Sequence, residues 1–401
     1  MNMVQHFHRL NVLLFSCTLF FTLCGLFLVP QGNHYLSKLL VLSSVVGFIN
    51  YFIGNKDKLG VSARNLYVCV LIYIAAIGAS RLVHDDESWL IRNLFYILVF
   101  FLLIPREAIV IRAFKLGALL GGISIGLLAI WQHNNGMFRV EGFTNAILFA
   151  QGALILVILN GFFSQIESNK FVKCGYFIGA GAAVIAIYLS QSRGVWLALL
   201  MLTMLALSIK AIKKPVKYIA LFIIVFILLA IVFSETEIFK IRIQESLSEL
   251  SMMESNNYNT SWGLRVMAWK SAWFGFIEHP LLGIGLDGFK NIQHQQLLDG
   301  IVDNFYVNYG MYHAHNQFMQ NMVVRGIFGL LGAIAVLVYP MIFFYHRTKV
   351  LSAGFMVSFG IFVCALSDVP MEHQNTLYIY MITLFSLCLS YEIEKNKEVI
   401  S

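Results

Sequence analysis

Arg193 stands in a short polar turn, Ser190-Gln191-Ser192-Arg193-Gly194, directly before a long apolar segment. A helix that begins at this turn offers free backbone N–H groups and the positive end of its dipole, and both favour a phosphate group. The guanidinium adds a planar, permanently charged fork that can donate two hydrogen bonds to one phosphate. The alternative interpretation is an arginine that only extends from an apolar helix toward water.

Arg265 lies in a segment whose tryptophans are spaced at helical intervals. Trp262, Trp269 and Trp273 fall on one face of a helix predicted from about 262 to 278. Such a helix would lie along a membrane surface with its indole rings at headgroup depth, or it would belong to a small core outside the membrane. Arg265 is one turn from the first two tryptophans. It would contact lipid headgroups in general or act as a second clamp for an anionic lipid carrier.

The run His313-Ala314-His315-Asn316 precedes another long apolar segment. Histidine titrates near neutral pH and can accept a proton from a reacting hydroxyl, so His315 is a candidate general base. Two histidines separated by one residue also suggest a metal ion, but no third ligand is paired with them in the sequence, and no metal site is predicted. The alternative is a histidine in a solvated loop.

The composition indicates what kind of protein must hold these residues. Of 401 residues, 59% are hydrophobic and 12% are charged, whereas a soluble globular domain has about 25% charged residues. Repeated apolar runs of about 20 residues are typical of helices that cross a membrane. The sequence therefore predicts an all-α, polytopic integral membrane protein and excludes a water-soluble enzyme of the ordinary type.

The apolar runs predict about twelve transmembrane helices in three blocks. Residues 1–233 hold nine of them, residues 234–317 form one large loop with the amphipathic helix, and residues 318–401 hold three more and a short tail. The predicted spans lie near residues 10–29, 36–53, 66–80, 90–104, 114–131, 146–164, 171–189, 194–212, 217–233, 318–345, 353–367 and 376–391.

Lysine and arginine are distributed unevenly between the two sides of these spans. Seventeen lie at the termini and in alternate short loops, whereas the short loops on the other side hold four, Lys38, Arg81, Arg139 and Arg193. Because cytoplasmic loops are rich in these residues, both termini are predicted to be cytoplasmic. The cation-rich loops are 54–65, 105–115, 165–173, 210–217 and 346–352. The net charge of +7 is thus a topology signal and indicates no nucleic-acid partner.

The candidate residues gather on the outer side, which in a Gram-negative cell is the periplasm. Arg139 precedes one predicted span there, and Asp368, Glu372 and His373 occupy the last outer loop. No phosphate-binding loop, nucleophile elbow, zinc-protease helix or dinucleotide fingerprint is evident. Catalysis would therefore act on a substrate that is already activated, and a glycan held on a lipid diphosphate meets this condition.

The sequence resembles the O-antigen ligase and polymerase superfamily at four places. His315-Asn316, followed after nine residues by Gly326-Ile327-Phe328-Gly329, reproduces the signature H-[NSQ]-x9-G-x-x-G. Arg193-Gly194-Val195-Trp196-Leu197 fits the element R-x3-L, and His279-Pro280-Leu281-Leu282-Gly283-Ile284-Gly285 resembles a stretch of the large periplasmic loop. Arg139 to Asn145 is more loosely similar to the segment R-x-x-G.

This resemblance implies a GT-C-like membrane glycosyltransferase of the bacterial inner membrane that needs no metal or other cofactor. In the ligases, O-antigen on undecaprenyl diphosphate is the donor and the lipid A-core oligosaccharide is the acceptor. Arg193 and Arg265 match the family's two essential arginines by position, and His315 matches its essential histidine. Further candidate site residues are Asp368, Arg139 and Asn316.

Three other functions remain open at this stage. An O-antigen polymerase shares these motifs and differs in its acceptor, which is another lipid-linked glycan. A protein O-oligosaccharyltransferase usually carries an additional soluble C-terminal region, and only about ten residues follow the last predicted span. A lipid-linked glycan transporter would place ionisable residues within its spans, whereas here they gather at one face.

Overall fold

The computed structural model describes residues 3–53, 64–217, 236–348 and 352–400, together with positions 220, 223, 224 and 227. These residues are almost entirely helical and contain no β-strand, which confirms the predicted all-α class. The helices are α1 (Met3–Cys24), α2 (Gly32–Phe52), α3 (Arg64–His84), α4 (Trp89–Leu103), α5 (Ala108–Asn134), α6 (Ala146–Ile166), α7 (Lys170–Leu189), α8 (Arg193–Lys213), α10 (Glu237–Glu254), α11 (Ser261–Glu278), α12 (Gly285–Leu298), α13 (Asn304–Tyr309), α14 (Gln317–Leu337), α15 (Tyr339–Thr348), α16 (Ala353–Ala365), the 3-10 turn η1 (Pro370–Glu372) and α17 (Gln374–Ile400).

Nine helical segments among the described residues are long and apolar enough to cross a membrane, as expected of a polytopic membrane protein. They are α1, α2, α3, α5, α6, α7, α8, the α14–α15 pair and the first part of α17. The predicted spans at 90–104 and 353–367 correspond to the shorter apolar helices α4 and α16. Most of the predicted span at 217–233, most of the loop 54–65 and part of the loop 346–352 lie outside the described residues.

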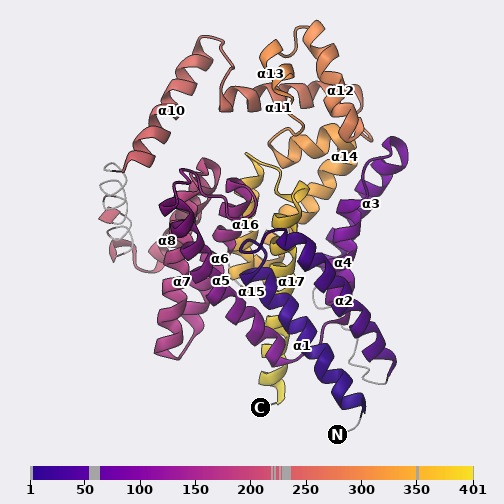
Figure 1. The fold of residues 1–401 in the computed structure, drawn as a ribbon, viewed down its shortest axis with the longest axis vertical. Helices are drawn as coiled ribbons and strands as arrows, with labels where there is room; N and C mark the ends of the chain where they lie inside the picture. The colour runs from indigo at the N-terminus through magenta and orange to yellow at the C-terminus, as the bar shows by residue number, and fades with distance from the viewer. Residues whose placement is uncertain are drawn as a thin grey trace.

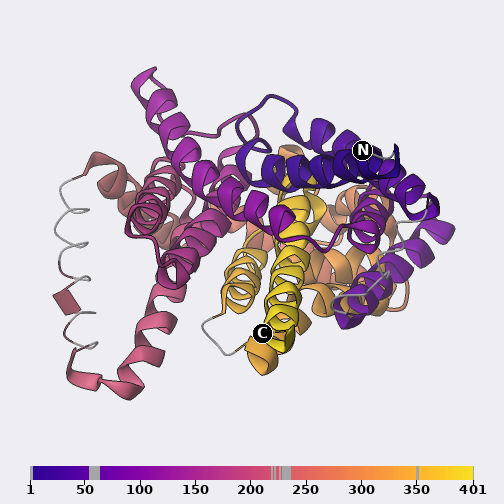
Figure 2. The same cartoon turned by 90° about the horizontal axis from the view of Figure 1, so that it is seen from below.

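Two helices form the centre of the bundle. The apolar parts of α6 and α17 are 72% buried, more than any other candidate span, and the view from below shows α17 surrounded by its neighbours (Figure 2). Small residues allow the helices beside them to pack closely. At Gly122 of α5 a Cβ would collide with the backbone of α7 at Gly179.

The two ends of the bundle differ. Both chain termini lie at one end, whereas α11, α12 and α13 lie at the other, and α11 runs across the long axis of the molecule (Figure 1). The predicted helix at 262–278 is present as α11, and it ends at Glu278 just before His279-Pro280.

The sequence left two interpretations of this helix open, a helix that lies along the membrane surface and a helix in a small core outside the membrane. Each describes part of α11. Its small and apolar face, including Leu264 and Met267, packs with Tyr306 of α13 in a core separate from that of the bundle. On the other face Trp262 is 40% exposed and Trp273 is 46% exposed. The helix therefore belongs to a small separate core and still presents indole rings outward.

The predicted span at 318–345 is interrupted in the structure. The backbone of α14 leaves helical geometry at Gly326, where φ is +63°, and a second break separates α14 from α15. The motif that begins at His279 explains the first break. The backbone of Pro280 and Ile284 bonds with that of Ile327 and Val323, at 2.8 and 2.9 Å. A Cβ at Gly326 would overlap the carbonyl group of Leu281, so this position requires glycine.

Candidate functional site

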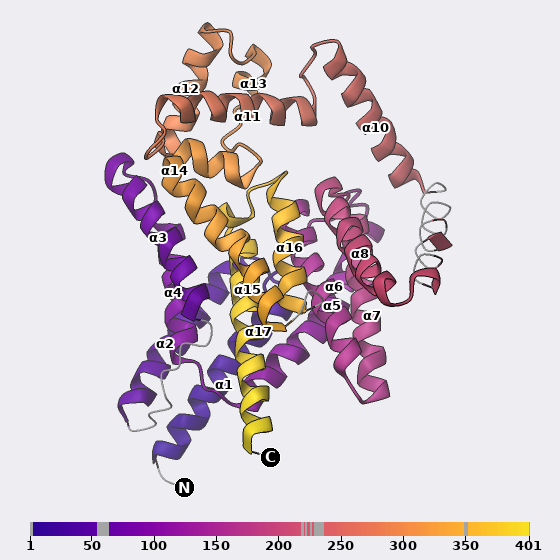
Figure 3. The ribbon, with the colours of Figure 1, turned by 180° about the vertical axis from the view of Figure 1, so that it is seen from behind.

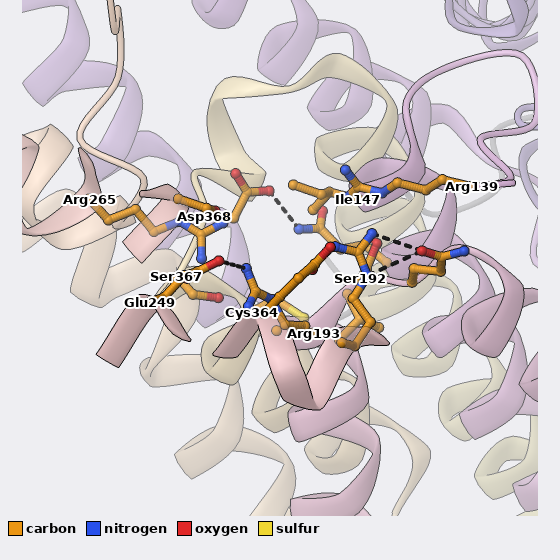
Figure 4. A pocket seen from close by; sticks show the side chains of 16 residues that line it. Arg139, Ile147, Ser192, Arg193, Glu249, Arg265, Cys364, Ser367 and Asp368 are labelled. Atoms are coloured by element: carbon orange, nitrogen blue, oxygen red, sulfur yellow. Dashed lines mark hydrogen bonds and ion pairs between the residues drawn. The ribbon is translucent and has the colours of Figure 1, made fainter. Parts of the chain in front are cut away.

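A polar cavity of about 420 Å³ opens at the end of the bundle that carries α11. Four arginines and three carboxylates face it, from helices that are far apart in the sequence (Figure 4). The lining residues are Arg139, Ile147, Gln151, Gln191, Ser192, Arg193, Gly194, Val195, Arg242, Glu245, Glu249, Ser261, Arg265, Cys364, Ser367 and Asp368. The structure thus brings together four of the six residues singled out from the sequence, Arg139, Arg193, Arg265 and Asp368.

Arg193 is the first residue of α8, as the sequence predicts. The turn before it is buried, and the Ser192 hydroxyl donates to the carbonyl of Ala146 rather than capping α8. A Cβ on Gly194 would collide with the Ser367 hydroxyl. The glycine therefore allows the start of α8 to lie against the loop that carries Asp368.

Arg265 enters the cavity from α11. Its guanidinium carbon lies 6.0 Å from the centre of the Trp262 ring, a cation–π distance. No hydrogen bond joins this guanidinium to another described side chain, so its donors face the cavity (Figure 4). Burial lowers the pKa of Arg265, as does the charge of Arg193, while the carboxylates of Asp368 and Glu249 oppose the shift.

Arg139 reaches the cavity from the loop between α5 and α6. Its Nε donates to the carbonyl oxygen of Ser190 at 3.1 Å, which joins this loop to the turn before α8. Burial lowers the pKa of Arg139, and the nearby charges of Arg242, Arg193 and Arg265 lower it further. Mutually repelling cations of this kind favour an anionic ligand between them.

His315 lies beside the cavity rather than in its lining. Its Nδ1 is 3.6 Å from Oδ1 of Asp368, slightly beyond hydrogen-bond distance. The other carboxylate oxygen of Asp368 accepts a hydrogen bond from Nε2 of Gln151 at 2.8 Å. The Thr376 hydroxyl donates to Oε1 of the same glutamine at 2.8 Å. Asp368 thus connects His315 to the four-arginine cavity, and His315 itself has a left-handed φ of 45°.

The pKa of Asp368 lies below its usual range despite complete burial. Burial alone would raise it, but the His315 side chain and the charge of His373 outweigh this effect. The pKa of His313 is lowered, first by burial and then by the charges of His373 and His315. Asp368 is therefore a charged carboxylate beside the His315 imidazole.

Three histidines gather at this place, because His313 lies 5.8 Å from both His315 and His373 between ring centres. Within the described part of the chain, no group of three or more His, Cys, Asp or Glu side chains is arranged to hold a metal ion.

Asn316 caps a helix and does not line the cavity. Its side-chain oxygen caps α14 by accepting from the backbone N–H groups of Phe318 and Met319, and its amide donates to the carbonyl oxygen of Leu366 at 3.1 Å. Asn316 therefore links the start of α14 to the end of α16, and it is absent from the cavity lining.

Arg325 is a functional candidate that the sequence interpretation missed. Both amino groups of its guanidinium bind the carboxylate of Glu372, at 2.6 and 3.1 Å, and the pair is almost completely buried. An ionisable residue inside a predicted span was the available signal. The pair joins the break in α14 to the loop that also carries Asp368, so it supports the geometry around His315.

A second missed group comes from α10. Arg242, Glu245 and Glu249 project from one face of this helix into the cavity. Arg242 donates to the Gln191 side chain and pairs with Glu245 at 2.6 Å. Glu249 pairs with Arg193 at 2.9 Å. Their spacing at three and four residues was the signal for one helical face.

Comparison with known proteins shows which family this site resembles. Residues 178–334, a segment that contains Arg193, Arg265 and His315, match the family described as O-antigen ligase. This stretch of the chain is similar in sequence to the O-antigen ligase family. The match confirms the resemblance inferred from the motifs. An uncharacterized protein of Haemophilus influenzae is 27% identical over 356 residues, which cover 85% of this chain and 87% of that protein.

The family match supports a general function. It indicates an O-antigen ligase or polymerase type of function in the processing of glycans related to lipopolysaccharide, and a glycosyltransferase-like activity. The family match also implies lipid-linked glycans and lipids as partners, and the apolar helices indicate a multi-pass membrane protein.

Proposed function

We propose that this protein is an O-antigen ligase of the bacterial inner membrane. It transfers O-antigen polysaccharide from undecaprenyl diphosphate to the lipid A-core oligosaccharide at the periplasmic face, without a metal ion, and both of its termini are cytoplasmic. The observation that carries the proposal is the cavity in which Arg193 and Arg265 lie together, with His315 beside it at Asp368. The cavity is lined in part by α11, which lies at the end of the bundle opposite the termini (Figure 1).

His315 is assigned the role of general base. An acceptor hydroxyl attacks the anomeric carbon of the donor, a new carbon–oxygen bond forms, and the hydroxyl proton passes to the imidazole. The carboxylate of Asp368 faces Nδ1, so it favours the tautomer with the proton on Nδ1 and leaves Nε2 free to accept. The same carboxylate then stabilises the imidazolium that forms.

The arginines stabilise the leaving group. When the bond between the anomeric carbon and the phosphate oxygen breaks, its electron pair stays on the lipid diphosphate, which gains negative charge. Arg193 and Arg265 face this charge as preorganised cations in a half-buried cavity. Displacement by direct attack inverts the anomeric centre. Removal of either guanidinium should cost on the order of 3 kcal/mol or more of transition-state stabilisation.

Reconstitution of the purified protein in liposomes tests the proposal. With lipid-linked O-antigen and lipid A-core present and no ATP, the lipid A-core is expected to gain polymer. Movement of the glycan across the bilayer without a new glycosidic bond would contradict the proposal and indicate a transporter.

A second experiment separates a ligase from a polymerase. A strain that lacks a ligase makes lipid A-core without O-antigen and accumulates the lipid-linked polymer. A strain that lacks a polymerase makes core with a single repeat unit, and this result would replace the ligase assignment with the polymerase alternative.

Two substitutions test the assigned roles in the liposome assay. His315→Ala should abolish transfer while the protein still inserts and folds, and transfer at the wild-type rate would contradict the general-base assignment. Arg193→Lys should transfer poorly because an ammonium group cannot make the two-donor contact of a guanidinium. Near-normal transfer by this variant would indicate that Arg193 acts only through its positive charge.

A further inference from the structure

The guanidinium of Arg193 is already occupied in the structure. Its Nη1 donates to the Ser246 hydroxyl at 3.0 Å, and its Nη2 donates to Oε1 of Glu249 at 2.9 Å. Both partners come from α10, where they lie one turn apart on the face toward the cavity. The two-donor fork that would hold a phosphate therefore holds a serine and a carboxylate instead. Figure 4 shows Arg193 beside Glu249.

The Glu249 carboxylate is only partly satisfied in this position. Its side chain is 12% exposed, and its second oxygen, Oε2, is buried without a hydrogen-bond partner among the described residues. A buried acceptor that lacks a donor loses free energy relative to one in water. The contact with Arg193 is therefore one that a better anion can replace.

Helix α10 has few apolar contacts with the rest of the protein, at its beginning and against α11. Thr236 accepts a hydrogen bond from Tyr188 at 2.6 Å, and Ile238 packs at the edge of the main core. None of its residues from Glu237 to Glu254 is buried. Its outward face exposes Ile243, Leu247 and Leu250, so its inward contacts beyond the first turn are largely the polar ones at the cavity.

The charges of the cavity also change if α10 moves away. The lining with α10 has four arginines and three carboxylates, Glu245, Glu249 and Asp368, a net charge of one positive. Without α10 it has Arg139, Arg193, Arg265 and Asp368, a net charge of two positive. The net charge of the lining without α10 thus matches the two negative charges of a lipid-linked diphosphate diester better than the net charge of the lining with α10 does.

We propose that Glu249 is an internal competitor for the anionic donor. Its carboxylate occupies the anion position on Arg193 while the cavity is empty, and the diphosphate of a lipid-linked donor displaces it, so that the cavity face of α10 moves away from Arg193. The identity of the donor rests on the proposed function. A phosphate ligand of lower charge replaces the carboxylate less well, so Glu249 raises the charge that a ligand must carry to bind.

Binding of farnesyl diphosphate to the full-length protein in detergent tests the competition. Because Glu249→Gln removes the competing negative charge from Arg193, this variant is expected to bind the probe at least about threefold more tightly than the wild type. Glu254→Gln, at the exposed end of the same helix, should bind like the wild type. Equal or weaker binding by Glu249→Gln, or no measurable binding by either protein, overturns the proposal.

Hydrogen exchange provides a second readout that does not depend on a variant. Addition of farnesyl diphosphate to the wild type should speed amide exchange in residues 237–254, whereas farnesol, which lacks the diphosphate, should not. Protection of these amides by the diphosphate would overturn the proposal.

The failure of this proposal is distinguishable from a failure of the proposed function. A protein that shows both effects but transfers no glycan to lipid A-core refutes the ligase assignment alone. A protein that transfers glycan but lacks both effects refutes the role of Glu249 alone.

Discussion

Replacement of Asp368 by asparagine removes one negative charge and changes little else in size. The carboxylate lies 3.6 Å from Nδ1 of His315 and is 4% exposed. At an effective dielectric constant of about 20, two unit charges at this separation attract by roughly 4–5 kcal/mol. Water reaches the partly exposed imidazole and screens part of this attraction, so the expected loss of imidazolium stabilisation is about 2–4 kcal/mol.

Such a loss corresponds to a kcat about 30- to 900-fold lower in the liposome transfer assay. The KM for the donor should change little, because the imidazolium forms only as the acceptor loses its proton. Asp299→Asn, at the exposed end of α12, is the control and should transfer at the wild-type rate. Activity of the Asp368→Asn variant within about threefold of wild type would refute the pairing, provided that the variant has a normal unfolding temperature.

Three further predictions concern stability, measured by thermal unfolding of the protein in detergent. Arg325→Met leaves the buried carboxylate of Glu372 unpaired and should lower the free energy of unfolding by about 3–5 kcal/mol. The double variant with Glu372→Met should recover much of that loss. Equal stability of the single variant and the wild type would contradict a buried pair. Burial raises the pKa of Glu372, but the charge and hydrogen bonds of Arg325 outweigh this and hold it below its usual range. At this carboxyl the unfolded chain therefore binds more protons than the folded protein. The stability that Glu372 contributes should be constant from pH 7 to about 5, and the unfolding temperature should fall as the pH drops below about 4.3. That decline should be smaller in Glu372→Gln, and an identical pH profile in this variant would exclude Glu372 as its source. Gly326→Ala should destabilise the protein by more than about 1 kcal/mol, because φ is +63° there and the new methyl group meets the carbonyl of Leu281. The control is Gly181→Ala in α7, where nothing lies within 4 Å of the added carbon, and it should be neutral or stabilising. Similar unfolding temperatures for the two variants would argue against the constraint at Gly326.

The sequence predicts those parts of the site that stand at clear transitions in polarity. Arg193 follows a polar turn and begins an apolar segment, and His315 lies at the end of the large loop. Both residues can be recognised because they are polar and stand directly before long apolar runs. Arg265 was found because tryptophans mark the face of its helix. Their convergence on one cavity could not be derived from spacing, because it depends on how α8, α11 and the loop after α16 pack.

The parts that were missed have weaker patterns. α10 mixes both charges with isolated apolar residues, and its hydrophobic stripe is narrow, so its sequence pattern only weakly indicates a helix. Arg325 stands alone in an apolar run, and its partner Glu372 is 47 residues away. The break at Gly326 is also hidden, because the apolar run continues through it and the reason for the break is the distant turn at Leu281.

An experimental structure of the protein with a lipid-linked glycan diphosphate bound would test the central claim most directly. The diphosphate is expected between the guanidinium groups of Arg193 and Arg265, with the anomeric carbon turned toward Nε2 of His315. A diphosphate bound elsewhere in the bundle, or a sugar on the side away from His315, would contradict the claim.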